Sequence, residues 1–269
     1  MIDQTAAAIL TAYVHTSLAA ATPAPLVVGL CGAQGSGKST LAATVAATLV
    51  NEGVAVAVLS LDDLYLTHAD RVALGRRVHP LLATRGVPGT HDVALGMAIV
   101  AAIRAGRDAP LPRFDKARDD RLPVARWDTA PAGTRLLLLE GWCVGASPQA
   151  DAALTLPVNA LERDEDAAGI WRRYVNDALA GSYRAFFAKL DNLVLLEAPG
   201  FDVVLEWRAG QERALAARLG TDAPGVMDAP ALARFVAHYE RLTRHILAEM
   251  PARADLVIAL DRDRRVRAQ

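Results

Sequence analysis

A glycine-rich segment at residues 32–40 has the residue types and spacing needed to bind the phosphates of a nucleotide. It fits the pattern G-x-x-x-x-G-K-[ST], the P-loop. The apolar run 26–30 before it predicts a buried strand, and the Ala- and Leu-rich run 41–50 after it predicts a helix, which is the context that the motif requires. The phosphate-binding residues expected from it are Gly32, Ala33, Gln34, Gly35, Ser36, Gly37, Lys38, Ser39 and Thr40.

Each part of this motif has a physical role toward a triphosphate. Glycines let backbone N–H groups turn inward around phosphate oxygens, and the helix N-terminus adds its positive dipole at the same place. Lys38 is expected to reach the β- and γ-phosphates as a catalytic cation, and the Ser39 hydroxyl to ligate Mg²⁺. The chain has 29 Lys and Arg residues but only three lysines, so Lys38 stands where a compact ammonium is preferred to a guanidinium. ATP and Mg²⁺ are therefore the predicted cofactors.

Acidic residues follow two further apolar runs. Asp62 and Asp63 come after residues 54–59, and Glu140 ends residues 136–140. Because ligands of open α/β sheets bind outside the carboxyl ends of the strands, we expect these acids near the P-loop. Glu140 is predicted to bind Mg²⁺ with Ser39, and Asp62 to be the general base for an acceptor hydroxyl. Asp63 could instead cap the next turn, and the roles of the two aspartates could be exchanged.

Basic and aromatic residues in polar segments are candidates for binding the acceptor or the transferred phosphate. Arg113 and Lys116 lie in a segment that could hold an anionic acceptor, although a solvated loop would look similar. Arg208, on a predicted charged helix, could supply a catalytic lid arginine or belong to a solvated face. His91 could bind substrate or be polar surface. Further predicted substrate contacts are Tyr65 and Arg85.

Short apolar runs alternate with helical patterns along the chain. This predicts an α/β fold with a central, mostly parallel five-stranded sheet flanked by helices. The strands are expected at residues 26–30, 54–59, 136–140, 193–196 and 255–260. Residues 164–190 are expected to form one long helical stretch. We predict a single domain over residues 1–269, with residues 66–130 as a substrate-binding insertion. Within this insertion, residues 66–92 are expected to be irregular, 94–105 helical and 110–129 a loop.

Composition limits the other classes of function. The chain has 52% hydrophobic residues and a formal net charge of −1, so bulk charge does not suggest a nucleic-acid partner. Two cysteines give no disulfide framework. The first residues lack a basic segment, and no apolar run is long enough to span a bilayer, so we expect a cytoplasmic protein without membrane contact. Oligomeric state is not predicted.

The motifs taken together resemble known kinases. The P-loop followed by Ser60–Tyr65 resembles the phosphoribulokinase, uridine kinase and pantothenate kinase group, in which the aspartate corresponding to Asp62 is the base. Residues 85–92, 112–116 and 139–142 resemble more specifically the D-glycerate 3-kinases of plants and fungi. The sequence departs from that family at Leu64, where Phe is frequent, and at Phe114, where Tyr is frequent.

The resemblance implies an ATP-dependent phosphotransferase that acts on the C3 hydroxyl of D-glycerate and forms 3-phosphoglycerate. A carboxylate acceptor needs cations, and Arg85, Arg113 and Lys116 are available. One alternative is a kinase of another small acceptor, such as a nucleoside or pantothenate. Another is a regulatory P-loop NTPase, although the chain has neither the N-K-x-D motif of GTPases nor the L-S-G-G-Q motif of ABC-type ATPases.

Overall fold

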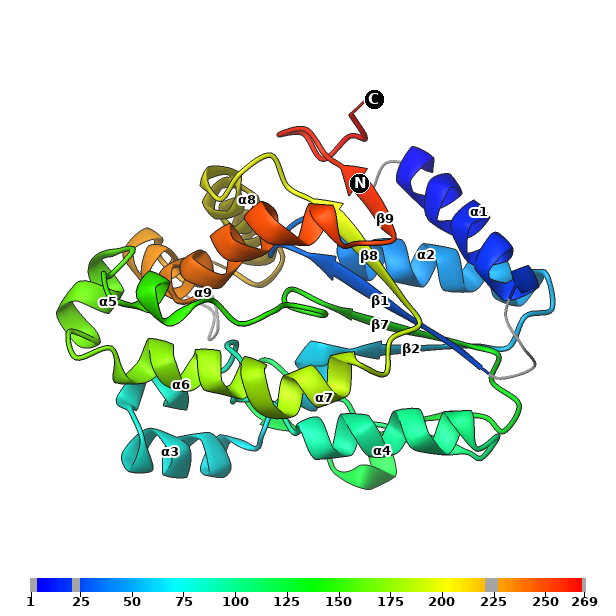
Figure 1. Ribbon diagram of the computed structural model, residues 1–269, viewed down its shortest axis with the longest axis horizontal. Coiled ribbons are helices and arrows are strands. Elements are labelled where there is room, and N and C mark those ends of the chain that lie inside the picture. Colours follow the sequence, from blue (N-terminus) through cyan, green and yellow to red (C-terminus); the bar gives the residue numbers. More distant parts are fainter. Residues whose placement is uncertain (1–3, 21–24, 221–226, 268–269) are drawn as a thin grey trace.

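The computed structural model describes residues 4–20, 25–220 and 227–267, and its centre is a sheet of five parallel strands (Figure 1). The strand order is β2-β7-β1-β8-β9. The strands are β1 (Leu26–Gly32), β2 (Val56–Ser60), β7 (Leu136–Gly141), β8 (Asn192–Glu197) and β9 (Leu256–Ala259). Each strand lies within two residues of its predicted position, so the predicted five-stranded α/β fold is confirmed.

Helices cover both faces of this sheet (Figure 1). Successive strand residues point to opposite faces, so Val27 packs into one core and Val28 into the other. The core on the Val28 side is closed by α1 (Gln4–Ala20), α2 (Lys38–Asn51) and α8 (Asp202–Leu219). The core on the Val27 side is closed by α4 (Val93–Arg104), α7 (Arg184–Phe187) and α9 (Ala229–Glu249), and α9 also reaches the first core. Burial on both faces explains why the strands read as continuous apolar runs.

The strand register brings the predicted chemical groups to one edge of the sheet. Glu140 of β7 pairs with Ser60 of β2 on one side and with Leu30 of β1 on the other. The P-loop after β1 and the turn after β2 therefore lie beside the end of β7. A short 3₁₀ turn, Leu61–Leu64, follows β2 and carries both aspartates. The Ser60 side chain caps this turn by accepting a hydrogen bond from Asp62 N. Parallel pairing thus joins three segments that are far apart in the sequence.

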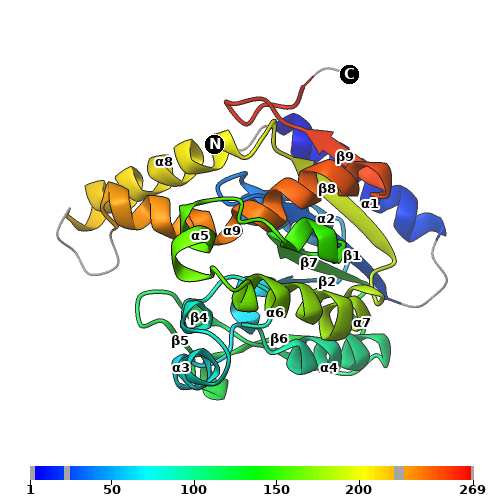
Figure 2. The same cartoon turned by 60° about the vertical axis from the view of Figure 1, so that its left-hand side comes forward.

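Residues 66–130 include the predicted helix at 94–105, which is confirmed as α4, and are otherwise more regular than the sequence suggested. They contain α3 (His68–Arg77), α4 and two small antiparallel sheets, which Figure 2 shows below the main sheet. The small sheets pair β3 (Ala109–Leu111) with β6 (Asp128–Ala130), and β4 (Phe114–Asp115) with β5 (Asp120–Arg121). The prediction of an irregular segment at 66–92 and of a loop at 110–129 was wrong, because α3 is polar and the strands have at most three residues, too few for a period to show. That residues 66–130 bind substrate stays a prediction.

The single long helix expected at residues 164–190 is broken into several pieces. They are α5 (Ala160–Glu165), α6 (Ile170–Ala178), a π-helical turn (Leu179–Tyr183) and α7. Gly169 is left-handed at φ 73°, and the Asp166 carboxylate accepts a hydrogen bond from Trp171 N at 2.8 Å, so the chain restarts there. Gly181 has non-helical angles inside the π turn. In the ranges that the structure covers, no helix is long and apolar enough to cross a membrane.

Candidate active site

The loop between β1 and α2 forms a cradle for phosphates. Gly35 and Gly37 have φ values of 82° and 92°, which favour glycine. A Cβ on Gly35 would also stand 2.6 Å from Cβ of Trp207, so α8 packs directly on the loop. No side chain caps the N-terminus of α2, which leaves its first N–H groups free for a ligand.

Buried polar atoms without partners in the described part of the chain surround this loop. They are the Ser36 hydroxyl and both amide atoms of Gln34. A buried polar group without a hydrogen bond is costly, and it is most simply explained by an absent ligand. The cradle therefore fits a polyphosphate, as the motif predicts.

Ser39 and Glu140 meet at the start of α2, where the sequence predicted a cation. The Ser39 hydroxyl donates to Oε1 of Glu140 at 2.9 Å. Oε2 of Glu140 is buried and has no hydrogen-bond partner within the described residues. A hydroxyl, a carboxylate and nearby phosphate oxygens suit Mg²⁺, which in kinases is bound by one or two carboxylates together with substrate phosphates and waters. This pair fits a magnesium ion, and no cluster of three or more His, Cys, Asp or Glu residues is present in the described ranges.

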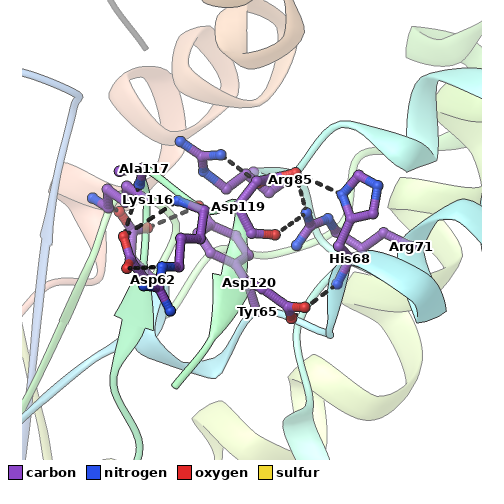
Figure 3. A network of polar contacts seen from close by, with 12 residues as sticks. Asp62, Tyr65, His68, Arg71, Arg85, Lys116, Ala117, Asp119 and Asp120 are labelled. Carbon is purple, nitrogen blue, oxygen red and sulfur yellow. Dashed lines mark hydrogen bonds and ion pairs between the residues drawn. The ribbon is translucent and has the colours of Figure 1, made fainter. Parts of the chain in front are cut away.

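Asp62 faces the same region and is held by two donors. Lys116 Nζ lies 2.7 Å from Oδ2, and the Tyr65 hydroxyl donates to Oδ1 at 2.9 Å (Figure 3). Burial acts to raise the pKa of Asp62, but the charges of Lys116 and Lys38 and the hydrogen bonds of Lys116 and Tyr65 outweigh it, so the pKa falls well below its usual range. Asp62 is thus an ionised carboxylate at the edge of the P-loop, and its role as general base stays a prediction.

Asp63 has a different environment. Its carboxylate accepts hydrogen bonds from Phe114 N and Arg113 Nη1, both at 2.9 Å. Burial raises the pKa of Asp63 despite these bonds. The turn is capped by Ser60, so the alternative role of Asp63 as a cap is wrong, and Asp63 instead ties β4 to the turn after β2.

A small cavity of about 90 Å³ lies between the P-loop and Asp62. Its lining residues are Gln34, Lys38, Asp62, Tyr65, Arg85, Lys116, Trp142, Arg208, Phe235 and Tyr239. Four of these residues are cations and one is an acid, so the cavity favours anions. Its volume suits a molecule of a few non-hydrogen atoms.

Arg113 lies outside this lining, so its predicted contact with substrate stays a prediction that this cavity does not support. Its guanidinium is taken by Asp63 at 2.9 Å and by Asp128 at 2.6 Å. With two carboxylates already bound, Arg113 braces β4 against its neighbours. Sequence spacing could not reveal this, because both partners come from other segments.

The segment 85–92 is held by hydrogen bonds from distant residues and from within the segment, and it places Arg85 at the cavity. Trp142 Nε1 donates to Gly86 O at 2.8 Å, and the Tyr239 hydroxyl donates to Arg85 O at 3.3 Å. The Thr90 hydroxyl closes the turn on Val87 O at 2.7 Å. These hydrogen bonds therefore fix the shape of the loop formed by residues 85–92.

Asp92 and His91 end the same segment. The Asp92 side chain caps α4 by accepting from Leu95 N at 3.0 Å. His91 stacks on Tyr65, with ring centroids 4.5 Å apart, and does not line the cavity. Burial lowers the pKa of His91 to about 3, so the ring is neutral at pH 7. His91 supports Tyr65 from behind, and direct contact with substrate stays a prediction.

Arg208 of α8 turns toward the cavity. Its guanidinium donates to Gln211 Oε1 at 2.6 Å and to Glu212 Oε1 at 2.9 Å, and it lies over the ring of Phe235. It is therefore not part of a merely solvated helix face. The sequence did not point to Phe235 and Tyr239, because α9 carries no motif and reaches the site only by packing.

Several known proteins are similar to this chain. A family model, methylmalonyl-CoA mutase-associated GTPase MeaB, matches residues 3–72, a segment that contains the P-loop but is about a quarter of the chain. The uncharacterised kinase mug58 of Schizosaccharomyces pombe is 36% identical over 225 residues, which are 80% of this chain and 78% of that protein. At this identity and coverage, the chain and mug58 belong to the same protein family.

Two D-glycerate 3-kinases are also similar to this chain. The chloroplastic enzyme of Arabidopsis thaliana is 28% identical over 89% of this chain and 53% of its own length, so the chain spans about half of that relative. The solved structure of the enzyme from Cryptococcus neoformans superimposes with a TM-score of 0.82, at 23% identity, over 97% of each chain. At that identity the superposition shows the fold.

Proposed function

Because the chain belongs to the kinase family that includes mug58, we propose that it transfers the γ-phosphoryl group of ATP to D-glycerate and forms 3-phosphoglycerate. The observation that carries the choice of acceptor is the charge of the cavity. Lys38 and Arg208 suit the phosphates, and Arg85 and Lys116 remain for an acceptor that carries its own negative charge. A carboxylate acceptor of a few atoms also matches the volume of about 90 Å³, which is too small for a nucleoside.

The P-loop end of the cavity is proposed to bind and polarise the nucleotide. The N–H groups of the loop and Lys38 would hold the phosphates, and Ser39 with Glu140 would hold Mg²⁺. Bound Mg²⁺ neutralises charge that develops on the transferred group. Arg208 would add a further positive charge on the side of α8.

The acceptor end is proposed to deliver the hydroxyl oxygen. Arg85 and Lys116 would bind the acceptor carboxylate, and Lys116 would leave Asp62 as it does so. Asp62 then takes the hydroxyl proton while the oxygen forms its bond to the γ-phosphorus. The bond from that phosphorus to the bridging oxygen breaks, and ADP leaves.

The ion pair between Lys116 and Asp62 predicts a change in pH dependence. Lys116 lowers the pKa of Asp62, so the carboxylate stays ionised as pH falls. In Lys116→Met that stabilisation is lost while burial and the charge of Lys38 remain, so the pKa of Asp62 rises relative to the wild type. We expect the acid limb of kcat/KM to lie at higher pH in the variant than in the wild type, measured from pH 4 to 8.

The matched control for this profile is Lys189→Met, because Lys189 is exposed and distant from the cavity. The titration of the substrates is the same for all three proteins, so a difference in the limb belongs to the enzyme. An acid limb at the same pH in Lys116→Met and wild type would contradict the pairing as the cause of the low pKa.

Glu140→Gln tests the proposed magnesium site. The amide keeps the size of the side chain but removes the charge that Mg²⁺ needs. We expect the Mg²⁺ concentration for half-maximal activity to rise about tenfold or more, with an unchanged melting temperature. A Mg²⁺ titration of ADP release at constant free ATP measures this, and an unchanged midpoint would count against Glu140 as a ligand.

The activity itself is tested by ADP release from Mg·ATP with D-glycerate, L-glycerate, uridine, pantothenate or no acceptor, with the product identified by mass spectrometry and NMR. Stimulation by D-glycerate with 3-phosphoglycerate formed is the expected result. Stimulation by a different acceptor would keep the kinase chemistry and discard the substrate. Hydrolysis that no acceptor stimulates would favour a regulatory NTPase.

A cytoplasmic location and the absence of a nucleic-acid partner stay predictions from composition.

A further inference from the structure

The tip of the β4–β5 hairpin carries an aspartate that no motif singled out. Asp119 stands between Lys116 and the start of β5, with a left-handed φ of 53° that few non-glycine residues adopt. Figure 3 shows its carboxylate among cationic side chains from other segments. Such a conformation is retained when the surrounding contacts require it.

Three side chains converge on the Asp119 carboxylate. Arg71 Nη2 donates to Oδ2 at 2.5 Å, His68 Nδ1 lies 3.0 Å from the same oxygen, and Arg85 Nη1 donates to Oδ1. Burial acts to raise the pKa of Asp119, but the bonds from His68 and Arg85 and the charge of Arg71 lower it, so the group is ionised. Asp119 is thus a fixed negative charge shared by α3 and the segment 85–92.

Arg71 makes this junction rigid. Its side chain is 0% exposed, and it also donates to Leu66 O at 2.8 Å and to the backbone carbonyl of Asp119 at 2.9 Å. A buried guanidinium with several fixed partners holds its neighbours in one arrangement. The hairpin tip is therefore fastened to α3 by both the backbone and the side chain of Asp119.

Two cavity cations depend on this junction. Arg85 lines the cavity while its guanidinium bonds to Asp119, and Lys116 stands three residues before Asp119 on the same tip. The Lys116 side chain is 61% exposed and pairs with Asp62, so the position of the tip determines whether its ammonium can reach that carboxylate. Asp119 itself does not line the cavity.

We propose that Asp119 is a positioning residue for the acceptor, which orients Arg85 and holds the hairpin so that Lys116 faces Asp62. It would set the affinity for an acidic acceptor without touching it. The inference rests on the proposed function, because it assigns the two cations to the acceptor carboxylate. Among the described residues, Asp119 bonds to His68, Arg71 and Arg85 and not to Lys38 or Arg208 at the nucleotide end, so we expect ATP affinity to be independent of it.

The test is the change in KM for each substrate in Asp119→Asn. Asparagine tolerates the left-handed backbone and keeps the side-chain shape, so the substitution removes the charge together with one of the two acceptor oxygens. We expect KM for D-glycerate to rise about tenfold or more, with KM for ATP within about twofold of wild type. A purely structural role would instead lower the melting temperature and change both KM values together.

The control variant is Asp128→Asn, which removes a carboxylate from another arginine of the same region, Arg113, outside the cavity. Both KM values should stay near wild type there. If Asp119→Asn does not fold, Asp119→Glu keeps a charge beside Arg71 but displaces it, and KM for D-glycerate should still rise. An unchanged acceptor KM in the folded variant overturns the role of Asp119. Wild type that phosphorylates no acidic acceptor overturns the proposed function, and this inference with it.

Discussion

Asp62→Asn should lower kcat about 10²- to 10⁴-fold while leaving the fold and ATP binding intact. The asparagine amide keeps the side-chain shape and can still accept the hydrogen bond from the Tyr65 hydroxyl, but it cannot take the proton of the acceptor hydroxyl. Steady-state ADP release with D-glycerate measures kcat, and nucleotide binding by calorimetry measures the ATP site separately. Melting temperature shows that the variant is folded.

The matched variant is Asp63→Asn, because the two aspartates are neighbours and the sequence left their roles exchangeable. Asp63 accepts from Phe114 N and Arg113, so its amide variant should lose some stability but keep most of kcat. Near-full activity in Asp62→Asn, or the large loss in Asp63→Asn instead, would show that the base is wrongly assigned.

Lys38→Ala is the second change with a large expected effect. Lys38 is the cation of the P-loop and lines the cavity with Asp62, so its removal leaves the transferred phosphoryl group without the P-loop cation. We expect kcat to fall about 10²-fold or more, since a preorganised donor is lost from the transition state. Single-turnover transfer from labelled ATP measures this step without product release.

Lys189→Ala is the control for this substitution, since it removes a lysine that is exposed and outside the cavity. It should retain wild-type turnover. Turnover within a fewfold of wild type in Lys38→Ala would refute the phosphoryl-transfer role of the P-loop lysine and weaken the kinase mechanism as a whole.

The sequence by itself determined the fold and the nucleotide end of the site. Burial on both faces makes the strands of a parallel sheet continuously apolar, so all five could be recognised. The P-loop is a local device in which glycines, a lysine and a helix start act within nine residues, and its geometry follows from the chain alone. Glu140 and Asp62 could be placed because the ends of parallel strands share one edge.

The tertiary structure alone decided the acceptor end. Lys116 meets Asp62 across 54 residues, and Tyr239 reaches Arg85 across 154. Arg113 and Lys116 looked alike in sequence. In the folded protein, however, Arg113 pairs with Asp63 and Asp128, whereas Lys116 pairs with Asp62 at the cavity. The ion-pair partners of a charged side chain depend on which segments the folded backbone brings near it. A local residue pattern therefore does not predict them. The same reason hid Asp119, whose role depends on residues from α3 and the segment 85–92 that only folding brings to it.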